Sequence, residues 1–365
     1  MSTNTFRADV PGADGVTPPD LFFDRRRFVK SAAIASLMSP MISCESESTS
    51  DPSSSDSDPT PPGEPTIVDL SPSRPGGPLV LPLSWPEGFT FHKDESITLP
   101  EAVDHTLTDR FVAGTYNNYY EFLMGRAGPV WLYTRNFEVE PWRVEVKGEC
   151  HSPMTFDLDD LFRFEHEERL YHFRCVERWA MNVPWVGFPL SRLLEKVDPT
   201  SDAKFVSFHT AHRPRQMPGL AQAGSYQFPY HEALRIDEAM NELTLLATGI
   251  YGEPLPKQHG APIRLVVPWK YGYKSPKSIV SIELHREQPE TFWASGAQKH
   301  EYGFLSNVNP NIPHPRWSQA KSVWAKAETW FDTPIFNGYE KYVASMYPDE
   351  PRTPQASLQK GDIAR

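Results

Sequence analysis

The feature that most constrains the fold is a change of composition after Cys44, because residues 45–65 are almost entirely Ser, Thr, Asp, Glu and Pro. Such a segment cannot bury a core, so a solvated linker is expected over 44–65. Residues 66–350 are then left to form one continuous folded domain, and about 300 residues suffice for a sizeable core. The polar residues 351–365 lack periodicity and are expected to form a flexible tail.

Residues 1–43 have the pattern of an export signal. Arg25-Arg26-Arg27-Phe28-Val29-Lys30 precedes a mildly apolar run that is too short to span a bilayer. A twin-arginine pair in this setting is typical of the Tat pathway, which exports folded proteins, and it predicts a periplasmic location. Met41-Ile42-Ser43-Cys44 also resembles a lipoprotein cleavage box. Cys44 is therefore expected to carry a lipid anchor, with ordinary cleavage nearby as the alternative.

Composition excludes several classes of protein. The linker holds six acidic residues and no basic ones, and the formal net charge of the chain is −11, so nothing suggests nucleic acid as a partner. With only three cysteines, this exported chain cannot build a disulfide framework and must be stabilised by its core. The sequence contains no Walker phosphate loop, no dinucleotide fingerprint, no nucleophile elbow and no C-x-x-C pair.

Short helices and strands alternate at irregular spacing along the folded part. Helices are expected near 155–161, 190–197 and 234–240, and strands at 142–148, 203–211, 262–267 and 277–284. The run 262–267 is almost wholly apolar, as in a strand that is covered on both faces, and 277–284 is expected to be its neighbour. This mixture indicates an α+β fold rather than a doubly wound series.

Cys175 lies in the segment Phe173-Arg174-Cys175-Val176-Glu177-Arg178-Trp179. An arginine on either side favours the thiolate, which attacks electrophiles or binds a soft metal, and arginines also bind oxyanions. The alternative is an inert cysteine buried in a core rich in tryptophan. His166 and His172 resemble a zinc site only superficially, because six residues put them on different faces of a helix, and surface histidines are the better interpretation.

Blocks of sequence in a fixed order carry a family resemblance. They are Tyr116-Asn117-Asn118-Tyr119-Tyr120-Glu121-Phe122, Arg174-Cys175-Val176-Glu177, Gln216-Met217-Pro218-Gly219, Val267-Pro268-Trp269-Lys270-Tyr271-Gly272, Glu301-Tyr302-Gly303-Phe304, Asn307-Val308-Asn309-Pro310 and His314-Pro315-Arg316-Trp317-Ser318-Gln319-Ala320. With them, the chain resembles the catalytic subunits of periplasmic protein-methionine-sulfoxide reductases, which are molybdopterin-dependent and sulfite oxidase-like. The resemblance implies a sulfite oxidase-type molybdopterin-binding fold with mixed sheets, short helices and long irregular segments.

The resemblance also implies which residues bind the cofactor. Cys175 matches the cysteine that ligates molybdenum, with Arg174 and Glu177 next to the metal site, and Glu177 would orient water or relay protons. An ion pair of Glu177 with Arg174 or Arg178 is the structural alternative. The implied contacts to molybdopterin are Asn117, Tyr120, Glu121, Thr210, His259, Arg264, Ser275, Pro276 and Lys277. Because Pro276 has no N–H, Lys277 and the Ser275 N–H are expected to carry more of the anion binding.

The activity implied by the resemblance is the reduction of methionine sulfoxide residues in periplasmic proteins, which is protein repair. Two electrons and two protons convert each sulfoxide to a thioether and water. Electrons would come from a haem-containing, quinol-oxidising membrane subunit. Two alternatives stay open: an oxygen-atom transferase of the same fold that acts on a small sulfoxide, N-oxide or sulfite, and a non-catalytic lipoprotein that binds an anionic ligand.

Overall fold

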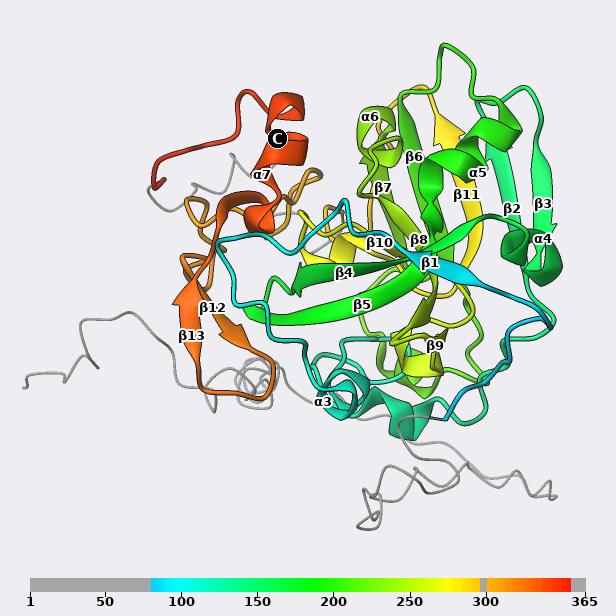
Figure 1. Cartoon of the computed structure of the whole chain (residues 1–365), viewed down its shortest axis with the longest axis horizontal. Coiled ribbons are helices and arrows are strands. Elements are labelled where there is room, and N and C mark those ends of the chain that lie inside the picture. Colours follow the sequence, from blue (N-terminus) through cyan, green and yellow to red (C-terminus); the bar gives the residue numbers. More distant parts are fainter. Residues whose placement is uncertain (1–79, 296–300, 356–365) are drawn as a thin grey trace, which may run out of the picture. The chain divides into compact units, whose positions relative to one another are not determined.

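Two long antiparallel strands run through the centre of the domain and are joined by the turn that holds Cys175 (Figure 1). They are β4 (His166–Arg174) and β5 (Trp179–Pro189). The computed structural model describes residues 80–295 and 301–355. The expected export signal, the linker and Cys44 lie outside the described residues, as does most of the expected tail.

The first sheet has eight strands arranged around β5. Its main path runs β1-β4-β5-β12-β13, and β8 pairs with the far end of β5 and with β9 and β10. Nine successive positions of β5 are buried, so both of its faces are covered. The remaining strands are β1 (Phe91–Lys93), β8 (Leu245–Ile250), β9 (Glu253–Pro254), β10 (Arg264–Val266), β12 (Lys321–Trp324) and β13 (Trp330–Asp332).

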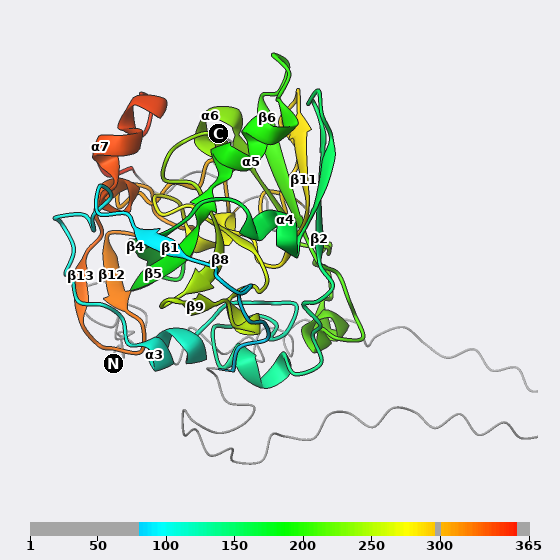
Figure 2. The ribbon, with the colours of Figure 1, turned by 45° about the vertical axis from the view of Figure 1, so that its right-hand side comes forward.

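The second sheet has five strands in the order β3-β2-β11-β6-β7. They are β2 (Arg143–Gly148), β3 (Met154–Asp157), β6 (Phe205–Thr210), β7 (His231–Arg235) and β11 (Ile279–His285). Val144 and Val146 of β2 point into the core between exposed neighbours, which is the alternation that predicts this strand. Figures 1 and 2 show this sheet on one side of the domain and the β12–β13 hairpin on the other.

The helices are short, as expected for this fold class. The described α-helices are α3 (Arg110–Thr115), α4 (Leu158–Phe162), α5 (Leu190–Val197), α6 (Ile236–Ala239) and α7 (Glu340–Val343). The described 3₁₀ helices are η2 (Val130–Tyr133), η3 (Pro218–Gln222), η4 (Lys257–His259), η5 (Gly272–Lys274), η7 (Ile335–Gly338) and η8 (Ala344–Met346). None of the described helices is long and apolar enough to cross a membrane.

Both sheets contribute to one continuous core. Phe188 and Leu246 enter it from the first sheet, and Val146 and Phe208 enter it from the second. Burial of this apolar surface is the main stabilising term, at roughly 25 cal/mol per Å². The prediction of an α+β chain held by its core is confirmed, and Cys150 and Cys175 are both free thiols.

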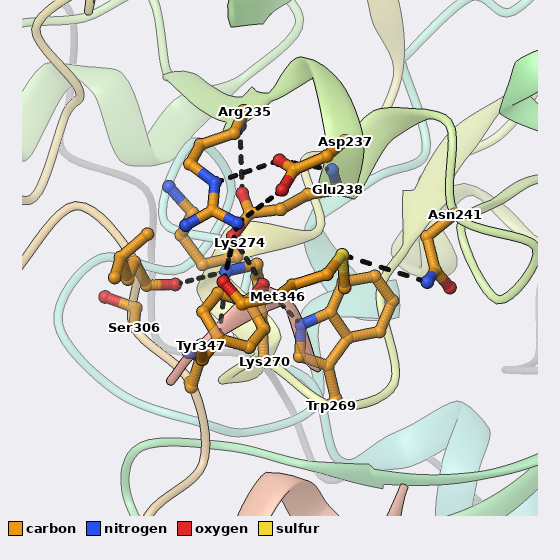
Figure 3. A network of polar contacts seen from close by, with 12 residues as sticks. Arg235, Asp237, Glu238, Asn241, Trp269, Lys270, Lys274, Ser306, Met346 and Tyr347 are labelled. Carbon is orange, nitrogen blue, oxygen red and sulfur yellow. Dashed lines mark hydrogen bonds and ion pairs between the residues drawn. The ribbon is translucent and has the colours of Figure 1, made fainter. Parts of the chain in front are cut away.

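A buried polar network fixes the last described segment to the core (Figure 3). Lys270 Nζ lies 2.7 Å from Glu238 Oε1, and neither side chain is more than 1% exposed. The hydroxyl of Tyr347 donates to the same carboxylate and accepts from Trp269 Nε1 at 2.9 Å. Lys270 also donates to the carbonyl of Leu305, so each charge in this network is compensated within the chain.

The expected pairing of 262–267 with 277–284 holds at one end only, and one expected helix starts as a strand. β11 pairs with β2 and β6 of the second sheet, whereas β10 pairs with β8 of the first. The two runs still meet where the N–H of Ile279 donates to the carbonyl of Ile263 at 3.1 Å and Arg264 bridges to Lys277. Leu234 and Arg235 close β7 instead of opening a helix. Apolar runs report burial, and they carry no information about which sheet a strand joins.

The interpretation of His166 and His172 as surface residues is also wrong. Both lie on β4, and their exposed fractions are 1% and 0%. His166 Nδ1 contacts the carbonyl of Phe164 at 2.8 Å, and His172 Nδ1 contacts Asn182 Oδ1 at 2.8 Å. Burial lowers the pKa of each to about 4, so both are neutral core histidines.

Candidate active site

One cavity brings together nearly every residue that the sequence indicated. The predicted residues that line it are Asn117, Tyr120, Glu121, Cys175, Glu177, His259, Arg264, Ser275, Pro276 and Lys277. Thr210 lies one layer behind, where its hydroxyl donates to Glu121 Oε1 at 3.4 Å.

Cys175 is positioned by the tight turn between β4 and β5. Its N–H donates to the carbonyl of Trp179 at 2.9 Å, and its carbonyl accepts from the N–H of Arg178 at 3.0 Å. Arg178 has a φ of 78°, which the turn requires. The thiol therefore lies at the end of the two central strands, and its backbone is fixed by hairpin hydrogen bonds.

Arg174 favours the thiolate as expected, but burial of the sulfur outweighs its effect. Arg174 is fully buried and donates to Ser322 Oγ at 2.7 Å, and Arg178 stacks over the ring of Trp330 at 5.1 Å. Burial raises the pKa of the Cys175 thiol well above its usual range, and the nearby Glu177 carboxylate raises it further. A bound cation or metal would have to supply the further stabilisation of the thiolate that Arg174 alone does not provide.

Asn118 joins the thiol to the neighbouring carboxylate, a role that sequence reasoning did not assign. Its Nδ2 donates to Cys175 Sγ at 3.5 Å and to Glu177 Oε2 at 2.9 Å. Trp179 Nε1 donates to the same oxygen at 3.2 Å, and the N–H of Glu177 donates to the sulfur at 3.4 Å. The described contacts of the Glu177 carboxylate are thus with neutral donors. The sequence feature that could have identified this role is the position of Asn118 in the first matching block, next to the predicted cofactor contact Asn117.

A cationic group forms another part of the cavity wall. The Arg264 guanidinium donates to the carbonyls of Leu265, His259 and Ser275, each at 3.1 Å, and it stacks over Trp185 at 4.8 Å. Within the described part of the chain no carboxylate pairs with it. Burial lowers the pKa of Arg264 to about 9 and the pKa of His259 to about 3, and the charges of Arg264 and Lys277 add to the latter effect.

Lys277 approaches this group over a glycine. Gly260 has a φ of 100°, and a Cβ there would lie 2.6 Å from Cβ of Lys277, so only glycine allows this packing. Lys277 Nζ donates to the carbonyl of Asn118 at 2.9 Å. The Ser275 N–H donates to the carbonyl of Gly272 at 3.2 Å, so in this conformation it does not contribute to anion binding as expected.

Glu121 is a buried carboxylate that also lines the cavity. Burial raises the pKa of the Glu121 carboxyl, and burial together with the charge of Arg264 lowers the pKa of the Lys277 ammonium. Each group is therefore less fully ionised than it would be in an exposed ion pair. The backbone at Tyr120 and Glu121 is held by close contact with Gly219, where a Cβ would lie 2.2 Å from the carbonyl oxygen of Tyr120. The blocks around 117–121 and 216–219 therefore lie together.

Several polar atoms at the cavity are buried without a hydrogen-bond partner among the described residues. They are Asn117 Oδ1, Asn118 Oδ1 and Trp185 Nε1. Buried polar atoms of this kind are usually satisfied, so these three are available to a group that binds in the cavity. A pterin offers donors and acceptors for such atoms, its phosphate suits the uncompensated Arg264, and the Cys175 sulfur suits a soft metal. The residues present fit molybdopterin.

The fold and the site fit an oxidoreductase with a molybdopterin-binding domain. Residues 131–293 match the family model described as the oxidoreductase molybdopterin-binding domain. This match includes Cys175 and the cationic group at 259–277, whereas Asn117, Tyr120 and Glu121 precede it. The predicted α+β molybdopterin-binding fold and the predicted cofactor, molybdopterin with its molybdenum, are confirmed.

Among solved structures, the chain is similar to the sulfane dehydrogenase SoxCD from Paracoccus pantotrophus, with 20% sequence identity and a TM-score of 0.39. The match covers 51% of this chain and 45% of that chain, so the chain spans less than half the length of this relative. A likeness of this extent leaves the substrate to be argued from the residues of the cavity.

Two further arginines, Arg213 and Arg215, follow the end of β6 in the chain. Arg213 donates to the carbonyl of Glu138 and stacks over Trp142 at 4.9 Å, and Arg215 is exposed. Neither residue lines the cavity. Arg213 therefore has a packing role on the aromatic surface of the core.

Proposed function

We propose that the protein is a molybdenum-dependent reductase that removes oxygen from methionine sulfoxide residues of periplasmic proteins. The observation that carries this proposal is the set of groups around Cys175. The side chains that contact its sulfur and its neighbouring carboxylate are Asn118 and Trp179, which are neutral, and Glu177, which is acidic. A neutral sulfoxide is compatible with this environment.

Sulfite fits the same environment less well. Sulfite carries negative charge, and an anionic substrate at Cys175 would lie beside the Glu177 carboxylate, which disfavours it electrostatically. Arg174 and Arg178 have other partners in Ser322 and Trp330. Oxidation of sulfite is therefore the weaker candidate, and the cationic group at Arg264 is better suited to the phosphate of the cofactor.

Each part of the cavity has a defined contribution to this reaction. When bound, the cofactor supplies the two-electron oxygen-atom chemistry, with Cys175 as the protein ligand of the metal. Arg264, His259 and Lys277 would hold its anionic part. Glu177 is placed to hold a proton or to orient water beside the sulfur, and Asn118 fixes the direction of that carboxylate.

Partners and location belong to the same proposal. Electrons would come from a haem-containing, quinol-oxidising membrane subunit, and export would use the Tat pathway. A lipid anchor at Cys44 would hold the domain near such a subunit through effective concentration. Incorporation of labelled palmitate in the wild type and its loss in Cys44→Ala would support the anchor.

The test of the reaction compares the wild type with Cys175→Ser. Molybdenum content and reduction of a methionine sulfoxide peptide by reduced viologen are measured on both proteins. Stoichiometric molybdenum and activity in the wild type, with activity lost in the variant, are expected. A wild type that holds molybdenum but is inert toward sulfoxides and active toward sulfite would overturn the proposal. A protein without molybdenum, even from a cofactor-competent host, would leave an anion-binding lipoprotein.

A further inference from the structure

Three aromatic side chains form a continuous part of the cavity that the cofactor contacts above do not use. We call Tyr273, Trp293 and Tyr302 the aromatic wall. All three line the cavity. The ring centroids of Trp293 and Tyr302 are 4.9 Å apart, those of Tyr273 and Tyr302 are 5.2 Å apart, and those of Tyr273 and Trp293 are 6.4 Å apart. The three rings therefore contact one another at different tilts.

The aromatic wall is packed directly against the residues around the thiol. Tyr302 belongs to the same buried apolar cluster as Cys175 and Val176, and Tyr273 and Trp293 pack against that cluster. Burial raises the pKa of Tyr302, and the charges of Glu177 and Cys175 raise it further, as expected for a phenol close to both. A molecule that reaches Cys175 through this part of the cavity must touch these rings.

A second hollow lies behind the same wall. It shares Val176, Tyr273 and Tyr302 with the cavity of Cys175. Tyr273 and Tyr302 thus border both the site for a side chain and a space in which the rest of a longer molecule can lie. A methionine side chain that is still attached to a polypeptide needs this arrangement.

We propose that the aromatic wall binds the methylsulfinyl end of the substrate, with the S–O oxygen directed toward Cys175 and Glu177. This inference rests on the proposed function and names the part of the cavity that selects its substrate. Sulfur and its methyl group make favourable contacts with aromatic rings at about 5 Å. Because the three rings are tilted differently, the two epimers of a sulfoxide present their methyl groups to different surfaces, and the wall distinguishes them.

The test removes one ring and keeps the cavity otherwise intact. Trp293 is half-buried, so Trp293→Ala is expected to fold and to load molybdenum. We expect the KM for N-acetylmethionine sulfoxide to rise about three- to tenfold with kcat within about twofold, and the ratio of the two epimers to change. The Kd of the holoenzyme for the product, N-acetylmethionine, should weaken by the same factor in calorimetry, a readout independent of turnover.

Tyr226→Ala is the matched control. The Tyr226 ring lies 5.7 Å from Trp293 but does not line the cavity, so KM, epimer ratio and Kd should stay within about twofold of the wild type. If Trp293→Ala loads no molybdenum, Trp293→Leu, which keeps apolar bulk without the ring, is measured instead, with the same expectation.

The outcomes separate this inference from the proposed function. An active wild type whose Trp293 variants keep its KM, epimer ratio and Kd would overturn the inference and leave the proposed function standing. A molybdenum-loaded wild type that neither reduces sulfoxides nor binds the thioether would overturn the proposed function, and the inference with it.

Discussion

The segment 264–277 carries four cations in two different settings. Lys270 and Lys274 are buried and paired with Glu238 and Glu232 at 2.7 and 2.8 Å. Arg264 is equally buried but is surrounded by main-chain carbonyls and aromatic rings. Lys277, at the end of the segment, contacts a carbonyl at the cavity.

The difference shows which charges the chain balances by itself. A buried ion requires compensation, and the network of Figure 3 provides it from within the protein. At the cavity, Arg264 donates to main-chain carbonyls and pairs with no described carboxylate, and several buried polar atoms have no hydrogen-bond partner among the described residues. We interpret the first region as structural and the second as a binding site whose missing charge comes from a ligand.

The largest effect is expected on breaking the paired region. Lys270→Met leaves the Glu238 carboxylate buried without its cation, so the free energy of unfolding should fall by about 3–5 kcal/mol. Urea denaturation followed by circular dichroism measures this change. The double variant Lys270→Met/Glu238→Gln should lose much less than the two single variants together. A loss below about 1 kcal/mol for Lys270→Met would contradict the comparison.

Replacing a lysine by methionine in the cavity should change cofactor binding rather than the stability of the fold. Lys277→Met is expected to weaken retention of the molybdenum cofactor about tenfold, or about 1.4 kcal/mol, while the stability of the cofactor-free protein changes by less than about 1 kcal/mol. Molybdenum content after dialysis measures retention. Lys257→Met, at a lysine that donates to the carbonyl of Arg135 outside the cavity, is the control and should keep its metal. Unchanged retention in Lys277→Met would remove this lysine from the site.

A pH series sharpens the comparison at His259. In the cofactor-free protein burial holds its pKa near 3, below the usual value of about 6.5, so its contribution to stability is complete above pH 6.5 and is lost as pH falls toward 3. A bound anion offsets the nearby cations, and we expect it to return the pKa of His259 to its usual value of about 6.5. Between pH 7.5 and 6, the stability gap between loaded and cofactor-free protein should widen by about 0.8 kcal/mol. A stability gap that does not change with pH would argue against an anion beside His259. So would a pH dependence of the gap that persists in the variant His259→Gln.

The smallest change in the free energy of unfolding is expected on breaking an exposed ion pair. Lys321 and Asp332 pair at 2.6 Å across β12 and β13, but both side chains are more than half exposed. Solvent screens such pairs, so Lys321→Met should change the free energy of unfolding by less than about 0.5 kcal/mol. A thermal melt at low and high salt measures it, and a larger change would mean that this edge hairpin contributes more to stability than its exposure suggests.

The sequence was informative where the pattern depends on neighbours in the chain. The alternating valines of β2 and the amphipathic stretch of α5 were predicted at nearly their observed bounds. Local pattern could not place β10 and β11 in different sheets, because two apolar strands look alike whichever partner they have. It also could not show that His166 and His172 lie on a buried strand.

The site shows the same division. The matching blocks placed almost all the predicted residues at one cavity, since residues tied to one ligand converge whatever their separation in the chain. The electrostatics of Cys175 could not be predicted from Arg174 and Arg178, because their partners, Ser322 and Trp330, lie about 150 residues further along. Asn118 was likewise missed, since its role depends on a contact with Glu177 across the cavity.

The position of Cys175 in the hairpin turn has a consequence for how the substrate range of such a protein can be altered. The proposed metal ligand is fixed to a hairpin between two central strands, whereas Trp293 and Tyr302 belong to irregular segments that follow the last strand of the second sheet. Exchange of those irregular segments would change what reaches the thiol without moving the thiol itself. The metal ligand and the segments that contact the substrate can therefore be changed independently, and grafting segments between relatives is a practical route to new substrate ranges.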